Sequence, residues 1–347
     1  MVLAGVRQHK VVAGLEFYLD EMPGETRAVV TQNGEVHSLY IERDTDRFEN
    51  RLGTQLVGRV ARVEPGLKAA FIDTGAGEPF GFMSLPKAVH LTEGQKVRVQ
   101  VSAEIRESKG PALKYLGEGQ GDARILSAGP GVTQILRELA GSEEIITGLK
   151  AVEMSLHAEE EARSTSVIRS DVGLDLAIQR TRALIAADID YAPLPGRDSR
   201  KGRDAVNRFG LNEVARQLRL KHWGGIVAID LAGVAFQGDS IVNLAKAVFS
   251  GWNGVAIGPL SRFGLLQVSV PWSHTPLDER LAHRDTVLLD SVRRLHHALL
   301  SDRATPVYEL VCGAESAKRL APLVAALGPR ARLSADGPAG AFTIKQG

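Results

Sequence analysis

Cysteine is nearly absent from this chain, since Cys312 is the only one among 347 residues. A single cysteine excludes a disulfide within the chain, and it excludes a zinc site built on a pair of cysteines. Isolated cysteines of this kind are usually small, buried, apolar residues. We therefore expect Cys312 to belong to a hydrophobic core.

Long apolar runs are also missing. No stretch reaches the length of a membrane-spanning helix. The first ten residues, MVLAGVRQHK, lack the apolar centre of a secretory signal peptide. With 44% hydrophobic and 24% charged residues, the composition is that of an ordinary globular protein. We therefore expect no membrane span and a cytoplasmic location.

A strong net charge is the third absence, because the formal charge is only +1. The protein as a whole is not a polycation, but its basic residues are unevenly distributed. Residues 51–116 contain ten Lys or Arg against six Asp or Glu, and residues 180–223 contain ten against five. Local basic surfaces of this kind suit a phosphate backbone, although ordinary solvated charge explains such counts equally well.

The first part of the chain is rich in strand signals. Residues 26–43 have alternating apolar positions on both sides of Asn33-Gly34, a pair typical of tight hairpin turns. Residues 53–105 hold several short strand-like runs and a Gly-rich turn, which indicates a small barrel. The Gly-rich stretch 117–131 is typical of a domain boundary.

The second part alternates strands and helices, which indicates an α/β arrangement. The apolar runs in TRALIAADID (181–190) and GIVAID (225–230) predict buried strands. Between them, residues 205–223 predict an amphipathic helix that ends at Gly224-Gly225. After residue 275 the pattern predicts a helix, a strand, a second helix and a last strand.

Aspartates end both of these predicted strands. Asp188 and Asp190 are two residues apart, so they share one face of their strand, and Asp230 ends the next strand. Neighbouring carboxylates repel unless a cation lies between them, and hard oxygen ligands suit Mg²⁺ or Mn²⁺. Open α/β sheets bind ligands at this edge. From spacing alone this signal is weak, because aspartates at the ends of strands are common as turn formers.

Three stretches resemble one known family. GRVARVEPGLKAAFIDTGAGEPFGFM (58–83) is similar to the RNA-binding barrel of the RNase E/G endoribonucleases, an oligonucleotide-binding (OB) fold of the ribosomal-protein S-one type. EVARQLRLKHWGGIVAIDL (213–231) and SRFGLLQVS (261–269) resemble the catalytic core of that family, and the order of the segments agrees.

The resemblance implies a mixed α/β (α+β) fold. An RNase H-like scaffold would carry the inserted OB barrel and would be followed by a DNase I-like catalytic domain and a small C-terminal α/β domain. The implied boundaries are 1–50 for the first part of the scaffold, 51–116 for the OB barrel, 117–180 for a shortened scaffold or linker, 181–275 for the catalytic domain and 276–347 for the C-terminal domain.

The resemblance also implies roles for individual residues. Asp188 and Asp230 fall on the two metal-binding aspartates of the family, and Asp190 falls where the family usually has an asparagine that contacts the scissile phosphate. These three are the candidate catalytic residues. The implied RNA-binding residues are the barrel aromatics Phe71 and Phe82 and the basic residues Lys109, Arg106 and Arg262.

The sequence departs from the family at three places. The Cys-Pro-x-Cys segment that links two subunits through zinc is missing, so we expect no zinc, and a homodimer without a zinc link stays open. Only 71 residues separate Leu116 from Asp188, where larger members hold a pocket for the 5′-terminal phosphate. The third departure is Asp190, whose extra carboxylate would either add a metal ligand or repel the scissile phosphate.

These observations predict a compact Mg²⁺-dependent endoribonuclease that cleaves single-stranded RNA with metal-activated water, in RNA processing or decay, independently of the 5′ end. Mn²⁺ is the alternative ion. A rival prediction is a non-catalytic RNA-binding protein with a degenerate nuclease site. A metal phosphoesterase acting on another substrate is a third reading, against which the barrel argues.

Overall fold

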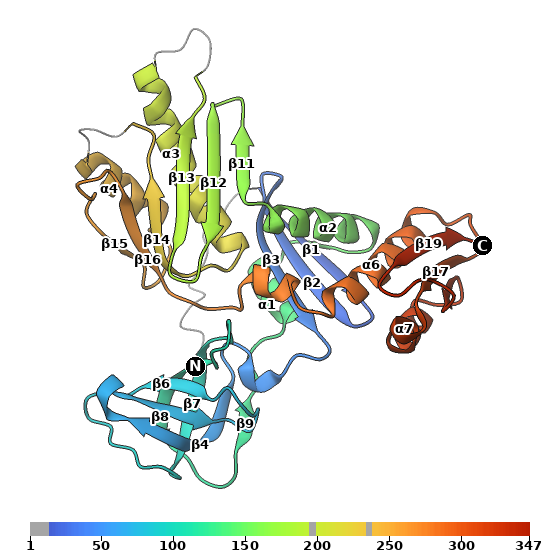
Figure 1. Ribbon diagram of the computed structural model, residues 1–347, viewed down its shortest axis with the longest axis horizontal. Coiled ribbons are helices and arrows are strands. Elements are labelled where there is room, and N and C mark those ends of the chain that lie inside the picture. Colours follow the sequence, from blue (N-terminus) through green and yellow to red (C-terminus); the bar gives the residue numbers. More distant parts are fainter. Residues whose placement is uncertain (1–13, 194–198, 234–237) are drawn as a thin grey trace. The chain divides into compact units, whose positions relative to one another are not determined.

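The computed structural model describes residues 14–193, 199–233 and 238–347, and these form two compact units. The described residues of the smaller unit run from Glu160 to Ser273. The larger unit holds those up to Glu159 and those from His274 onward. Both units contain helices and strands, so the chain is a mixed α/β protein (Figure 1). In the described part of the chain, no helix has both the length and the apolar character that crossing a bilayer requires.

The larger unit begins with a four-stranded sheet in the order β10-β1-β2-β3. Its strands are β1 (Leu15–Met22), β2 (Glu25–Gln32), β3 (Glu35–Arg43) and β10 (Ile145–Ile146). Positive φ angles at Asn33 (52°) and Gly34 (81°) make the β2–β3 connection a type I′ turn, which confirms the predicted hairpin. Helix α1 (Val132–Ala140) covers one face and shares a core with Phe17, Ala28 and Val30.

A closed five-stranded barrel follows the first three strands. Its strands are β4 (Gln55–Glu64), β5 (Ala69–Asp73), β6 (Gly81–Ser84), β7 (Lys96–Ala103) and β8 (Ala112–Glu118), with short 3-10 helices at Phe48–Asn50 and Pro65–Leu67. The order is β5-β6-β8-β7-β4, and the barrel closes because β4 also pairs with β5. The residues that fill it alternate along each strand, as Ala70, Ile72 and Met83 show.

The Gly-rich stretch after the barrel is not only a boundary. It contains β9 (Arg124–Ser127), which pairs with β4 in antiparallel register. The predicted boundary at 117–131 therefore holds a further strand of the barrel sheet. The exact domain limits stay a prediction.

The smaller unit is built on a six-stranded sheet in the order β11-β12-β13-β14-β16-β15. Its strands are β11 (Ser166–Arg169), β12 (Leu174–Arg180), β13 (Ile185–Tyr191), β14 (Gly225–Asp230), β15 (Ala256–Ile257) and β16 (Leu266–Val270). Strands β13 and β14 are parallel, and the other neighbours are antiparallel. The two strands predicted to end in aspartates are thus direct neighbours.

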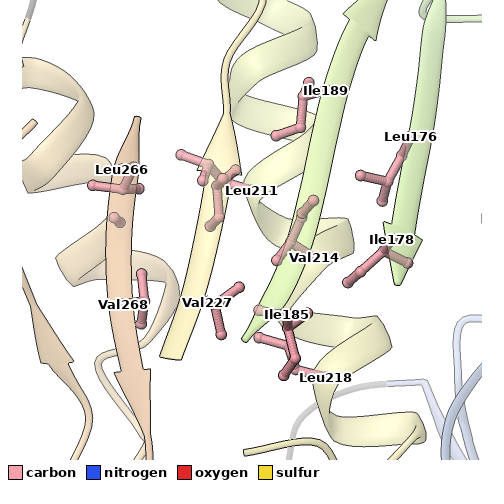
Figure 2. Close-up of a cluster of buried hydrophobic side chains, with 14 of the residues drawn as sticks. Leu176, Ile178, Ile185, Ile189, Leu211, Val214, Leu218, Val227, Leu266 and Val268 are labelled. Carbon is pink, nitrogen blue, oxygen red and sulfur yellow. The ribbon is translucent and has the colours of Figure 1, made fainter. Parts of the chain in front are cut away.

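One face of this sheet is buried and the other is exposed. Alternate residues of β12, β13, β14 and β16 pack against helices α3 (Ser199–Leu220) and α4 (Gly238–Val248), forming the core seen in Figure 2. Leu176, Ile189 and Val227 belong to this core. The intervening residues are exposed or half-buried, and they include all the aspartates of these strands. Strand alternation therefore presents every one of these carboxylates on the uncovered face.

Helix α3 ends earlier than the sequence predicts. Its last residue is Leu220, and His222 has a positive φ of 55°, so the chain already turns before Gly224. The left-handed His222 ends the helix, because it lets the N–H of Trp223 donate to the carbonyl oxygen of Leu218 at 2.9 Å. Just beyond the helix, the side chain of Lys221 is buried and its ammonium donates to the carbonyl oxygens of Ala162 (2.7 Å) and Ser164 (2.6 Å). These carbonyls lie at and just beyond the end of helix α2 (Leu149–Arg163). Lys221 thus caps the C-terminus of α2.

The C-terminal part of the larger unit contains α5 (Leu277–Leu281), α6 (Thr286–Ser301), β17 (Tyr308–Cys312), α7 (Ala314–Ala326), β18 (Ala331–Ser334) and β19 (Phe342–Gln346). Its three strands form a sheet in the order β18-β17-β19. Two of them, β18 and β19, follow α7, where the sequence predicts a single last strand. Cys312 is fully buried in the core of this sheet, as predicted.

A buried ion network joins this C-terminal part to the first sheet. Glu25 on β2 is fully buried and contacts Arg27 (2.8 Å), Arg43 (2.7 Å) and Arg293 of α6 (3.2 Å). Arg293 also contacts Asp20 at 3.0 Å. The pKa of Glu25 falls to about 2, because the three guanidinium groups outweigh the burial that by itself would raise it.

Candidate active site

The predicted metal ligands Asp188 and Asp230 lie side by side. They are directly opposite each other in the parallel pair β13–β14, so both project from the exposed face at the carboxyl ends of these strands. The backbone N–H of Leu231 donates to Oδ1 of Asp230 at 3.0 Å. The buried side chain of Asn207 then holds the chain after Asp230, with hydrogen bonds to the N–H (2.9 Å) and C=O (3.0 Å) of Ala232.

Two more aspartates extend this cluster. Asp190 lies two residues beyond Asp188 on the same face, and it is directly opposite Asp175 in the antiparallel pair β12–β13. Sequence reasoning did not identify Asp175. The alternating pattern of LDLAIQ places Asp175 on the polar face of its strand, but only the strand register reveals that it faces Asp190. The uncovered face therefore carries four carboxylates, which we call the acidic cluster: Asp175, Asp188, Asp190 and Asp230.

Within the acidic cluster, Asp188 is the carboxylate whose ionised form is disfavoured. The pKa of Asp188 is raised from its ordinary value, first by partial burial and then by the carboxylates of Asp190, Asp230 and Asp175. A bound cation would relieve this repulsion, so the donor chemistry of the pair Asp188–Asp230 fits a hard divalent ion.

The number of protein ligands is small. Within the described ranges, no three or more His, Cys, Asp or Glu side chains are grouped closely enough to hold one ion. A cation at this edge would therefore take two carboxylates from the chain and its remaining ligands from water or phosphate oxygens. Mg²⁺ is commonly bound in this way, because it keeps several of its waters.

The SRFG motif forms a turn at the same edge. Leu266 pairs with Ile229, so the turn before Leu266 lies beside the end of β14 that carries Asp230. Ser261 holds the turn, because its backbone N–H donates to the carbonyl of Leu265 (2.9 Å) and its hydroxyl accepts from the Leu265 N–H (3.0 Å). Arg262 is exposed on this turn.

The barrel aromatics form a pair on the barrel surface. Phe71 and Phe82 are directly opposite each other on β5 and β6, with ring centroids 5.8 Å apart and ring planes at 72°. Phe82 is exposed and Phe71 is half-buried, and neither belongs to the barrel core. The guanidinium of Arg62, which sequence reasoning did not single out, lies 4.5 Å from the Phe71 ring centroid. These three side chains form what we call the aromatic platform.

The loop before β8 lies beside Phe82. The N–H of Phe82 donates to the carbonyl of Pro111 at 2.8 Å. Gly110 approaches so closely that a Cβ there would lie 2.1 Å from the carbonyl oxygen of Phe80. This loop carries Arg106 and Lys109, whose backbones form a bridge, and the exposed ammonium of Lys109 contacts Glu107 at 3.2 Å. Two of the three predicted basic residues, Arg106 and Lys109, thus lie on the loop that borders the aromatic platform.

Three basic residues at or just beyond the C-terminal end of α3 make contacts inside the smaller unit. Lys221 is buried, as described above. Arg216 forms ion pairs with Glu161 and Glu213, which raise the pKa of its guanidinium although burial opposes this. Arg219 lies over the ring of Trp252, 4.9 Å from its centroid. Part of the positive charge counted over residues 180–223 therefore contacts groups of the smaller unit itself and does not form a surface for RNA.

Comparisons with known proteins match the part of the sequence that carries this site. Residues 133–270 match the model of the Ribonuclease E/G family. Ribonuclease E of Escherichia coli (strain K12) is 35% identical over 106 residues, which are 29% of this chain and 10% of that protein. Ribonuclease E of Haemophilus influenzae is 32% identical over 151 residues, 38% of this chain and 16% of that protein.

Ribonuclease G of Haemophilus influenzae is 34% identical over 79 residues, which are 23% of this chain and 16% of that protein. The matches thus span only a small part of the length of these relatives. The family match covers α1 through β16 and includes the whole acidic cluster and the SRFG turn. This part of the chain, residues 133–270, is therefore similar to the ribonuclease E/G family.

Proposed function

We propose that this protein is an endoribonuclease that hydrolyses phosphodiester bonds of single-stranded RNA and uses Mg²⁺, or alternatively Mn²⁺, held by Asp188 and Asp230. The observation that carries the proposal is the pairing of these two aspartates at the carboxyl ends of parallel neighbouring strands. That pair lies inside the segment that matches the family, whose relatives are named ribonuclease E and ribonuclease G.

In the proposed reaction, a water oxygen bonds to phosphorus while the bond to the 3′ oxygen breaks, leaving a 3′-hydroxyl and a 5′-phosphate. A divalent ion, when bound, supplies positive charge to the phosphate and lowers the pKa of a bound water. The chain's own contribution is positional. The Leu231 N–H fixes the Asp230 carboxylate, and Asn207 fixes the segment that follows it.

We propose that RNA is held by the aromatic platform on the barrel and by the basic residues Lys109, Arg106 and Arg262. Single-strand binders combine aromatic surfaces that stack on bases with cations that contact the backbone. The exposed ring of Phe82 is the contact surface, and Arg62 holds the Phe71 ring in place beneath its guanidinium.

We further infer the finer organisation from the family. The four-stranded sheet would be the RNase H-like scaffold, the closed barrel the OB domain, the six-stranded sheet the DNase I-like catalytic domain, and the sheet β18-β17-β19 the small C-terminal domain. A homodimer without a zinc link, a cytoplasmic location and activity that is independent of the 5′ end belong to the same proposal.

The test is incubation of the protein with labelled single-stranded RNA in Mg²⁺, in Mn²⁺ and in chelator. We expect cleavage with either ion and none in chelator. Asp188→Asn and Asp230→Asn should each abolish cleavage while RNA affinity stays near normal, because metal-held charge typically contributes several kcal/mol to the transition state. Asp239→Asn, an exposed aspartate in the first turn of α4, is the matched control. Full activity in either test variant would remove the assignment.

One observation favours the rival function. Asp175 and Asp190 add two carboxylates to the face that a phosphate would have to approach. A non-catalytic RNA-binding protein would bind RNA through the barrel, would not cleave it in either ion, and would tolerate Asp188→Asn. Phe82→Ala should weaken RNA binding under both proposals, so only the cleavage assay separates them.

A further inference from the structure

We propose that Phe263 is a base-stacking residue, so that the smaller unit binds a nucleobase of the single-stranded RNA in addition to the phosphate at the acidic cluster. The inference rests on the proposed function, because it adds a subsite to the same edge of the sheet. Phe263 lies on the SRFG turn between β15 and β16.

The ring of Phe263 is unusually exposed. It is 90% exposed, more than any other large apolar side chain in the described residues, the next being Ile168 and Leu67 at 67% and 66%. An apolar ring of this size would be stabilised by burial, so its full exposure leaves contact area free for a ligand. Exposure alone is weak evidence, since single exposed apolar residues are common.

The turn that presents Phe263 is a built structure. Besides the two hydrogen bonds between Ser261 and Leu265, the N–H of Gly264 donates to the carbonyl of Ser261 at 3.0 Å. Gly264 has a φ of 84°, which suits glycine best. On either side, Leu260 and Leu266 pack against the core of the smaller unit. The turn is therefore anchored at both ends and projects Arg262 and Phe263 outward.

The turn lies at the proposed reaction edge. The register of β14 with β16 places Leu265 beside Asp230, so Phe263 is two residues beyond the position opposite that aspartate. On the uncovered face of β14, Ala228 precedes Asp230, and its small side chain leaves space above the strand there. An extended strand of RNA whose phosphate meets Asp230 would therefore bring a neighbouring base within reach of the turn.

The neighbouring side chains favour RNA over a protein partner. Phe263 directly follows the exposed cation Arg262 and lies beside a carboxylate edge suited to a divalent ion. An aromatic ring next to an arginine is the combination with which single-strand binders hold a base and its phosphate. Every base offers a π-face, so we expect the contact to be tolerant of sequence.

The experiment compares Phe263→Ala, Phe263→Leu and Phe263→Trp in the full chain. RNA affinity is measured in chelator by fluorescence anisotropy, and kcat/KM for cleavage is measured in Mg²⁺. Loss of one stacked base predicts about a five- to hundredfold weaker interaction for Phe263→Ala. Phe263→Trp should keep wild-type values, and Phe263→Leu should lie between. Val287→Ala, an exposed apolar residue on α6, is the control and should change neither value.

An RNA series with one abasic nucleotide at each successive position gives the decisive readout. If Phe263 stacks on one base, a single abasic position should make the wild-type protein and Phe263→Ala equal, while every other position preserves their difference. A purely structural role of Phe263 would give the same difference at all positions and would overturn the inference.

The two proposals fail separately. Cleavage that requires Asp188 but is unchanged in Phe263→Ala refutes the base contact and leaves the nuclease standing. RNA binding without cleavage, together with one abasic position that removes the affinity difference between Phe263→Ala and the wild-type protein, supports the base contact and refutes the nuclease. Absence of both RNA binding and cleavage in the wild-type protein refutes both.

Discussion

At the scale of single residues, Asp190 and Asp175 set the charge that any phosphate must meet. Neither is opposite Asp230, and they face each other instead. Their carboxylates act on Asp188 through space, and both raise its pKa. Two like charges near the proposed metal pair can either strengthen the hold on a cation or keep an anionic substrate away, and these effects have opposite signs.

We expect Asp190→Asn to raise the cleavage rate at low Mg²⁺, because the change removes a negative charge that repels the scissile phosphate. The measurement is a Mg²⁺ titration of the initial rate, compared with the wild-type protein. A titration midpoint shifted to higher Mg²⁺ would instead identify Asp190 as a ligand. An unchanged rate and an unchanged midpoint would show that Asp190 serves neither role.

The residues of the candidate site differ in how visible they are in the sequence. Asp188 and Asp230 end apolar runs, so strand periodicity places them at the carboxyl edge of the sheet, and the family resemblance adds the prediction that they are metal ligands. Asp175 is visible only through the antiparallel register, and Arg62 only through the fold that brings it over Phe71. Contacts of this kind depend on pairing between strands, which local patterns do not encode.

At the scale of elements, Lys221 shows how a basic residue can be misread. Charge counting assigns it to a surface suited to RNA, whereas it lies buried at the C-terminus of α2, more than fifty residues earlier in the chain. The carbonyl oxygens at a helix C-terminus carry partial negative charge, so a cation there is stabilising. The amphipathic pattern of α3 does not predict that Lys221, just beyond this helix, caps the end of α2.

Lys221→Met should therefore lower the free energy of unfolding by about 1–3 kcal/mol, since it leaves buried carbonyls without a charged donor. RNA affinity should stay unchanged, because the ammonium is not accessible. Urea unfolding and anisotropy with labelled RNA test the two statements together. Lys246→Met, an exposed lysine in the last turn of α4, is the control. Weaker RNA binding with unchanged stability would contradict the capping role.

Local sequence patterns predict an element best where the conformation of that element is determined by its own residues. The β2–β3 hairpin follows from Asn33-Gly34, whose positive φ angles the turn needs. Strand β9 has only four residues inside a Gly-rich stretch, and its pairing with β4 crosses the length of the barrel sequence. A short strand of this kind gains its stability from a distant partner, so its own composition does not predict it.

At the scale of the whole molecule, the buried ion network links the first strands of the larger unit to helix α6. Glu25, Arg27 and Arg43 come from the hairpin, while Arg293 and Asp290 come from α6. Breaking a buried ion pair from one side leaves an uncompensated charge, which is costly. The network therefore makes the stability of this unit depend on residues nearly 270 positions apart.

Glu25 predicts an acid-sensitive fold. Its pKa is lowered to about 2 from an ordinary 4.5, so its ion pairs stabilise the folded state fully above pH 4.5, and that contribution is lost as the pH falls toward 2. The shift corresponds to stabilisation on the order of 3 kcal/mol. Urea midpoints measured from pH 6 to pH 3 should fall more steeply for the wild-type protein than for Glu25→Gln. Glu143→Gln, on an exposed turn, should keep the wild-type slope.

The last prediction concerns the 5′ end of the RNA. A phosphate pocket needs convergent donors, usually an arginine together with hydroxyl or backbone N–H groups. The candidates in the short segment before Asp188 already have partners inside the fold. The hydroxyl of Ser164 donates to the carbonyl of Ser166 at 2.8 Å. Arg169 contacts Asp171 at 3.4 Å and lies over the ring of Phe209.

We therefore expect one RNA carrying a 5′-hydroxyl, a 5′-monophosphate or a 5′-triphosphate to be cleaved at equal rates, and circular RNA to be cleaved as well. Recognition would then depend on the aromatic platform and on the reaction edge, neither of which needs a chain end. A tenfold preference for the monophosphate, about 1.4 kcal/mol, would contradict this. Loss of that preference in Arg169→Met but not in Arg182→Met would then identify Arg169 as a sensor of the 5′ phosphate.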